Sequence, residues 1–194
     1  GEEGGGTYGS AKDGKTAIIE IAAACGLTLI PEEERNPLQA TSYGVGELIL
    51  DAMGQGCREF IIGLGGSATT DAGVGMLQAL GFEFLDREGN EVGKGGVALH
   101  AIEQIETENA HPLLKECNFQ IACDVQNYLY GDEGAAFVFA PQKGASPKEV
   151  EQLDAGLRHV ANKTQESLGV DIHAIPGAGA AGGLGAAFSG FLNG

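Results

Sequence analysis

Two rhythms of apolar positions run along this chain, and together they predict strands alternating with helices. Residues 16–22 and 119–125 have the alternating or β-branched character of strands. Residues 59–66 form an almost continuous apolar run ending in glycines, which is typical of a strand buried on both faces. Apolar side chains at helical spacing predict helices over 44–56 and 72–80.

The second half of the chain continues this alternation. An acidic, glycine-containing turn predicts a hairpin or a strand over 82–92, and the run 137–141 predicts another strand. Ser146 and Glu149 have the spacing of a capping box at the start of a long helix, and Gly169 ends that helix. A glycine-rich turn and a helix of small residues close the sequence.

These elements predict an α/β fold, with a mixed sheet flanked by helices. We assign residues 13–194 to a single α/β domain and the glycine-rich residues 1–12 to a linker or chain end. The chain has 194 residues, of which 43% are hydrophobic and 20% charged, so it is long and apolar enough for a folded core.

The net charge of the chain limits the kinds of molecule that it can bind. The net charge is −16, from 27 acidic and 11 basic residues, which argues against nucleic acid and against an anionic membrane surface. An anionic substrate would have to be held by local donors or a metal ion. The four cysteines form no CxxC pair, and we read neither a signal peptide nor a membrane span. Reduced, buried thiols in a cytoplasmic protein are therefore expected.

One phosphate-loop match is rejected. Residues 9–16 fit G-x-x-x-x-G-K-T, but that loop needs a buried strand before it and a helix after it. Here a polar glycine-rich segment precedes the match and a strand-like run follows it. A turn that leads into a strand is the better interpretation.

The segment 63–71 carries the best candidate site, because it joins a buried strand to a helix, where α/β proteins bind ligands. Consecutive glycines let backbone N–H groups converge on an anion, and the helix start adds a positive dipole. Asp71 can serve as a general base or a Mg²⁺ ligand, although the residues slightly favour a plain helix cap. The proposed donors are Gly65, Gly66, Ser67, Thr69 and Thr70.

The same segment comes close to the nucleophile elbow G-x-S-x-G, with Thr69 in place of the last glycine. A serine hydrolase using Ser67 is therefore kept as an alternative. It would need a histidine, and none of the four histidines lies in a recognisable motif.

Three weaker candidates follow along the chain. Asp124, with Asn127 close behind, stands at the end of a strand and can hold a metal or a polyol, or simply form a turn. Lys143 can reach a phosphate, although lysines in such turns are usually solvated. The match to G-x-G-x-x-G at 177–182 lacks its downstream acidic partner, so close backbone packing is the better interpretation.

Taken together, several stretches resemble class I glycerate kinases in the order of that family. They are DGKTAIIEIAAACGL, RNPLQATSYGVGELI, IIGLGGSATTDAGVGMLQALG, ACDVQN, FAPQKGAS and PGAGAAGGLGAAF. The resemblance implies transfer of the γ-phosphoryl group of ATP to D-glycerate with Mg²⁺. It also implies two α/β domains with the active site in the cleft between them.

This chain resembles the middle domain of such a two-domain enzyme. The family's opening D-S-F-K motif and its closing T-G-E-G segment are absent, so the chain is expected to be incomplete for catalysis. Its expected partners are D-glycerate, the nucleotide and the missing Rossmann-like domain of the same enzyme, and a homo-oligomer is compatible with the resemblance. A non-catalytic domain that binds small hydroxy acids remains an alternative function.

Within the resemblance, Asp71 is the first candidate for activating the attacking hydroxyl or binding Mg²⁺, and Asp124 is the second. Arg35 lies in a matching stretch and can pair with the glycerate carboxylate in bidentate fashion, or be a plain loop arginine. The chain departs from the family at Tyr128, where a proline is usual, and at Thr70 and Ala72. These departures indicate a subfamily difference.

Overall fold

The computed structural model describes residues 7–11, 14–192 and 194. Its main sheet has four strands in the order β1-β2-β3-β6, where β1 is antiparallel to β2 and the other neighbours are parallel. A second, two-stranded sheet pairs β4 with β5 in antiparallel fashion. The strands are β1 (Gly9–Ser10), β2 (Thr16–Glu20), β3 (Glu59–Gly63), β4 (Glu83–Leu85), β5 (Gln104–Glu106) and β6 (Asn118–Ala122).

The helices follow the strands in the alternation that the sequence predicts. They are α1 (Ala22–Cys25), α2 (Tyr43–Gly54), α3 (Val74–Ala79), α4 (Ala135–Phe139), α5 (Pro147–Leu168) and α6 (Leu184–Phe191). Short 3-10 helices span Leu27–Leu29, Glu32–Glu34, Gly96–Ala101, Pro112–Glu116, Pro141–Lys143 and Ala180–Gly183. The predicted mixed sheet with flanking helices is thus confirmed.

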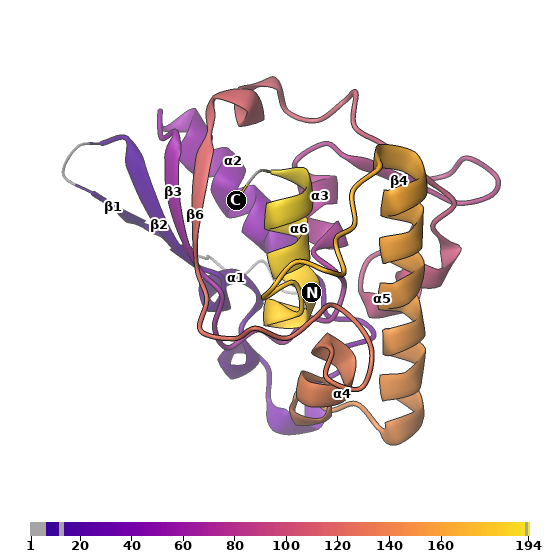
Figure 1. The fold of residues 1–194 in the computed structure, drawn as a ribbon. Coiled ribbons are helices and arrows are strands. Elements are labelled where there is room, and N and C mark those ends of the chain that lie inside the picture. Colours follow the sequence, from indigo (N-terminus) through magenta and orange to yellow (C-terminus); the bar gives the residue numbers. More distant parts are fainter. Residues whose placement is uncertain (1–6, 12–13, 193) are drawn as a thin grey trace.

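The helices lie on one side of the main sheet (Figure 1). On that face Ile19, Phe60, Ile62 and Phe119 are buried, and the rings of Phe60 and Phe119 stack at 4.9 Å. The opposite face is open among the described residues, and Ile18 there is 41% exposed. The prediction that β3 is buried on both faces is therefore wrong. Its alternate residues face solvent because no helix of the described chain covers them.

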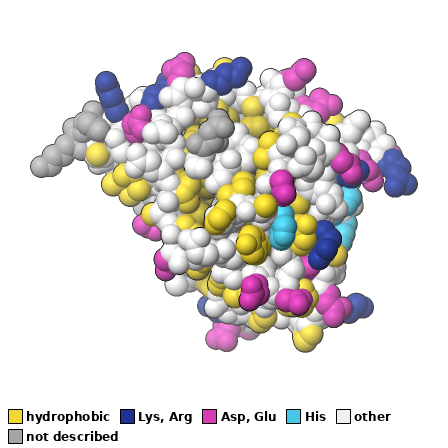
Figure 2. Space-filling view, in the orientation of Figure 1, with side chains coloured by type: hydrophobic (Ala, Val, Ile, Leu, Met, Phe, Trp, Pro, Cys, Tyr) yellow, Lys and Arg dark blue, Asp and Glu magenta, His cyan; other side chains and the backbone are white. Residues whose placement is uncertain are grey.

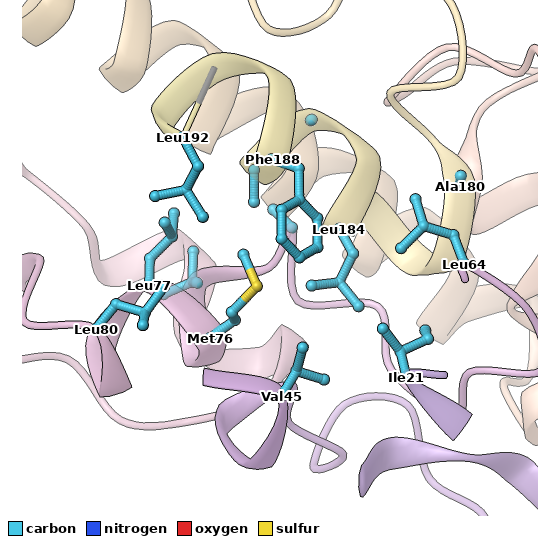
Figure 3. Packing of buried hydrophobic residues seen from close by; sticks show 14 of the residues in the cluster. Ile21, Val45, Leu64, Met76, Leu77, Leu80, Ala180, Leu184, Phe188 and Leu192 are labelled. Carbon is cyan, nitrogen blue, oxygen red and sulfur yellow. The ribbon is translucent and has the colours of Figure 1, made fainter. Parts of the chain in front are cut away.

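The last helix, α6, contributes to the core between the sheet and the other helices (Figure 3). Leu184, Phe188 and Leu192 from this last segment point toward Met76 and Leu77 of α3. A helix of small residues suits this place, because its backbone can approach neighbouring segments closely. Since α6 supplies core contacts to α3, the chain's end helps fix the loop that leads into α3.

One predicted strand is a helix. The sequence predicts an extended segment over 137–141, but α4 runs through Phe139 and a 3-10 turn follows it. Ala135, Ala136 and Ala140 are buried while Phe137 and Val138 are exposed. That spacing is helical, so packing of the small alanines against α5 overrides the strand propensity of the aromatic and β-branched residues.

The long helix α5 confirms its predicted ends. Ser146 Oγ accepts from the N–H of Glu149, and the Glu149 carboxylate accepts from the N–H of Ser146 at 2.7 Å. Gly169 has φ of 71°, the left-handed conformation that ends helices. The predicted hairpin is also present, since Val92 N–H donates to Phe84 across the turn, although the full partner of β4 is β5.

Two further sequence interpretations are settled by the fold. The rejected phosphate-loop match begins in β1 and ends at Thr16, where the strand β2 and not a helix begins, so the rejection is confirmed for the residues described there. The cysteines are unpaired, with Cys25 and Cys57 buried and Cys117 and Cys123 partly exposed. In the described part of the chain, no helix combines the length and apolarity needed to cross a bilayer.

Candidate functional site

The candidate site is the loop of residues 64–73, between β3 and α3, at the carboxyl ends of the parallel strands. Gly65 and Gly66 are exposed, whereas Ser67, Thr69, Thr70 and Asp71 are buried. The loop thus presents two glycine backbones to the surface and holds its side chains beneath them. Gly66 has φ of 66°, which a residue with a side chain adopts only with strain.

Segments that are distant in sequence enclose this loop. Leu27 N–H donates to Gly66 O and Ala68 N–H donates to Cys25 O, both at 2.8 Å. On another side, Ala72 N–H donates to Gly182 O at 3.0 Å. Gly182 has φ of 69°, and a Cβ there would collide with the Thr69 carbonyl. The predicted close backbone packing at 177–182 is therefore confirmed, and it is directed against the candidate loop.

Asp71 is completely buried and hydrogen-bonded through both carboxylate oxygens. Oδ2 accepts from the N–H and the hydroxyl of Ser42 at 2.8 and 2.9 Å, and from Gly75 N–H at 3.3 Å. Oδ1 accepts from Gly73 N–H at 3.2 Å. Burial raises the pKa of Asp71, and the hydrogen bonds partly offset that shift. Two of these donors, Gly73 and Gly75, lie at the start of α3, so Asp71 stabilises the N-terminus of that helix.

Lys143 is also buried, beneath the same loop. Its ammonium group donates to the Thr69 carbonyl at 2.5 Å and to Ser67 Oγ at 3.1 Å. Burial lowers the pKa of Lys143 to about 8, against the raising influence of Cys25 and Asp71 nearby. The alternative of a solvated surface lysine is therefore wrong, since the side chain is 3% exposed.

The thiol of Cys25 completes this polar cluster but is not set up to react. Burial raises the pKa of Cys25 to about 12, with the Asp71 carboxylate adding to the shift. A thiol with so high a pKa stays protonated and is a poor nucleophile.

Two buried polar atoms near the loop have no hydrogen-bond partner among the described residues. They are Thr70 Oγ1 and Arg35 Nε. Arg35 is half-buried, and its backbone packs against Gly144, next to Lys143. Buried polar atoms are usually hydrogen-bonded, so these two atoms are exceptions.

Asp124 and Asn127 follow β6 at the same edge of the sheet. Asp124 is exposed, and Ala122, two residues before it, accepts from Leu64 N–H at 3.1 Å. The Asn127 side chain donates to Glu133 O at 2.8 Å, so it stabilises the loop of residues 127–133. The strand ends at Ala122, three residues earlier than predicted. No group of three or more His, Cys, Asp or Glu is placed to hold a metal ion in the described chain.

Sequence reasoning missed the role of Ser42. This buried serine bridges two helices, because its hydroxyl donates to Asp71 and accepts from Met76 N–H at 2.9 Å. Ser42 is the N-cap residue of α2, yet its side chain makes no cap hydrogen bond to that helix. No pattern in the neighbouring sequence predicts a hydrogen bond between Ser42 and a residue 29 positions away.

The chain is similar in sequence to known glycerate kinases. The sequence model of the Glycerate kinase family matches residues 1–194. Glycerate 2-kinase of Escherichia coli (strain K12) is 51% identical over 192 residues, which are 99% of this chain and 50% of that protein. Glycerate kinase of Haemophilus influenzae is 52% identical over 178 residues, or 92% of this chain and 47% of that protein.

A solved structure shares the fold. The crystal structure of a glycerate kinase 2 from Salmonella typhimurium LT2 has a TM-score of 0.94 and 46% identity, and the match covers 96% of this chain and 50% of that one. The chain therefore spans about half the length of the relatives that it matches. Since the family's sequence model matches the whole chain, this protein belongs to the Glycerate kinase family.

Proposed function

We propose that this chain is the middle domain of an enzyme that transfers the γ-phosphoryl group of ATP to D-glycerate. The observation that carries the proposal is the match of the family over all 194 residues, together with the exposed glycine turn at the carboxyl edge of the sheet. Anions bind readily where consecutive backbone N–H groups point outward. The free thiols of the four cysteines support a cytoplasmic location.

In this proposal the loop 64–73 binds an anionic group of glycerate or ATP. The backbones of Gly65 and Gly66 make the contact. Beneath them the ammonium group of Lys143 supplies a positive charge in a chain of net charge −16. Thr69 and Ser67 act mainly by holding this cation, since both already accept from it.

Arg35 and Thr70 are proposed to complete the anion contacts. Each has a buried polar atom without a partner among the described residues, which a carboxylate or phosphate oxygen would satisfy. The Arg35 guanidinium can then bind the glycerate carboxylate in bidentate fashion. Asn127 is proposed to shape the neighbouring loop, because its amide is already hydrogen-bonded to Glu133.

The two candidate aspartates, Asp71 and Asp124, have different proposed roles. Mg²⁺ is usually held by one or two carboxylates together with substrate phosphates, and Asp124 is exposed at the strand ends where such a carboxylate is needed. When bound, the ion would neutralise charge that develops on the transferred phosphoryl group. Asp71 has both oxygens committed to N–H and O–H donors, so we propose that it positions the loop. Proton transfer from a substrate hydroxyl to Asp71 would require the loop to open.

The experiment is an assay of ADP release by the 194-residue chain with D-glycerate and Mg·ATP. We expect no turnover from a folded sample, because the chain spans only half of its relatives. Calorimetric titration with D-glycerate should still detect binding to the loop. Turnover by the isolated chain would mean that all catalytic groups lie within it. Absence of binding to both D-glycerate and Mg·ATP would contradict the proposed site.

One observation favours the serine hydrolase as a second candidate. Ser67 Oγ lies 3.1 Å from the nitrogen of Lys143, and serine–lysine pairs act as nucleophile and base in some hydrolases. However, Ser67 is only 4% exposed, and none of the histidines is hydrogen-bonded to it in the described structure. Ser67→Ala would abolish ester hydrolysis by a hydrolase, whereas it would only weaken binding by a kinase domain.

A further inference from the structure

The outer edge of β6 is unpaired. Asn118 N–H donates to Arg58 O at 2.8 Å and Ala122 O accepts from Leu64 N–H at 3.1 Å, so both residues hydrogen-bond toward β3. In a parallel ladder, successive residues point their N–H and C=O groups to opposite sides. The backbone groups of Phe119 and Ile121 therefore face away from β3, and no strand of the described chain pairs with them.

This edge lacks the usual protection against pairing. Edge strands are commonly short, or carry charged residues or proline. The opposite edge of the sheet meets this description, since β1 has two residues. By contrast β6 has five residues, NFQIA, with neither a charge nor a proline. Its edge is therefore competent to accept another strand.

A groove runs beside this edge. It has a volume of about 300 Å³ and lies between β6 and α6. Both polar and apolar groups line it, among them Ile121, Val125, Gln126, Ser189 and Gly194. Figure 2 shows hydrophobic atoms gathered near the middle of this face of the molecule, over the region of β6 and α6 in Figure 1. A side chain from a strand paired with β6 would enter this groove.

We infer that the free edge of β6 and the adjoining groove bind an extended segment from the half of the family's chain that this one does not span. That segment would add a strand beside β6 and place a side chain in the groove, where Gln126 and Ser189 offer polar contacts and Ile121 and Val125 apolar ones. Relatives twice as long have the chain to supply it. A second copy of this chain would bring another net charge of −16, which disfavours self-pairing. The inference rests on family membership and not on the catalytic proposal.

The test compares the isolated chain with a chimera in which this chain replaces the matching half of the Escherichia coli glycerate 2-kinase. Hydrogen exchange at the amides of Phe119 and Ile121 is the readout. We expect exchange at both amides to be slower in the chimera by about tenfold or more, because the added strand protects them. The amide of Gln120, which already faces β3, serves as the internal reference.

Two matched variants sharpen the test. Ile121→Pro removes the outward N–H without touching the ladder to β3, whereas Ile121→Val keeps that N–H and shortens the side chain. The proline should lower the melting temperature of the chimera clearly more than that of the isolated chain, and the valine should not show this difference.

Three results would overturn the inference. They are equal exchange at Phe119 and Ile121 in both proteins, equal effects of Ile121→Pro on both proteins, and protection of these amides in the isolated chain through self-association seen by sedimentation. A chimera that fails to fold would also count against it, because a matching strand should complete the sheet. Binding of D-glycerate by the isolated chain is independent of all these outcomes, so it tests the proposed function separately.

Discussion

The carboxylate of Asp71 and the side chain of Ser42 form a buried bridge, in which Oδ2 of Asp71 accepts from both the backbone N–H and the hydroxyl of Ser42. Because the same hydroxyl accepts from Met76 N–H, one serine connects the start of α2, the candidate loop and the first turn of α3. The position of the loop thus depends on a residue outside it.

Ser42→Ala should lower the free energy of unfolding by about 1–3 kcal/mol. The change leaves a buried carboxylate with one donor fewer and the Met76 N–H without its acceptor. Urea denaturation followed by circular dichroism measures this. Ser189→Ala, at a half-buried serine in α6, is the control and should stay within about 0.5 kcal/mol of the unmodified chain. Equal effects of the two substitutions would contradict the bridge.

The buried ammonium of Lys143 predicts a rise in stability with pH. Its pKa is about 8 in the folded chain against 10.5 for an ordinary lysine, so between these values the unfolded state binds more protons. The free energy of unfolding is therefore lowest below pH 8, where the buried Lys143 is charged. It increases as the pH rises above 8. From pH 7 to pH 9 the free energy of unfolding should increase by about 1 kcal/mol.

Lys143→Met supplies the control for this pH effect. The substituted chain should lose the increase between pH 7 and pH 9, which chemical denaturation at each pH would measure. The window stops at pH 9 because Cys25, whose pKa is raised to about 12, acts in the opposite direction at higher pH. An identical pH profile in both chains would show that Lys143 is not responsible.

Gly182→Ala should be strongly destabilising, by about 3 kcal/mol or more, since the new methyl group would collide with the Thr69 carbonyl. Gly169→Ala separates this clash from backbone strain. Gly169 has a similar φ of 71°, but no atom lies within 4 Å of the place that a methyl group would take, so its substitution should cost only about 1 kcal/mol. Thermal unfolding of both variants makes the comparison, and equal losses would contradict a clash.

Asp124→Asn tests the proposed Mg²⁺ contact in the Escherichia coli chimera. The exposed carboxylate contributes little to folding, so the melting temperature should stay unchanged. The Mg²⁺ concentration for half-maximal turnover should rise on the order of tenfold, because one charged oxygen ligand is lost. Asp132→Asn, at another exposed aspartate on the following loop, is the matched control. An unchanged Mg²⁺ requirement would remove Asp124 from the proposed site.

The sequence was sufficient wherever local chemistry decides the structure. The capping box of Ser146 and Glu149 and the terminal Gly169 located α5, because caps act over three or four residues. Apolar periodicity located β2, β3 and α2 for the same reason. The motifs of the family, read in order, indicated the fold class that comparison confirmed.

Only the tertiary structure decided which polar residues meet. Lys143 lies 74 positions from Thr69 and Ser42 lies 29 positions from Asp71, and a pattern along the chain carries no signal for contacts at such separations. Burial also decided the conformation of α4 and the lowered pKa of Lys143, because both depend on what the other segments of the chain place around them. The sequence by itself determined the family and those elements whose ends and apolar faces are set locally, and packing determined the chemistry of the loop that joins β3 to α3.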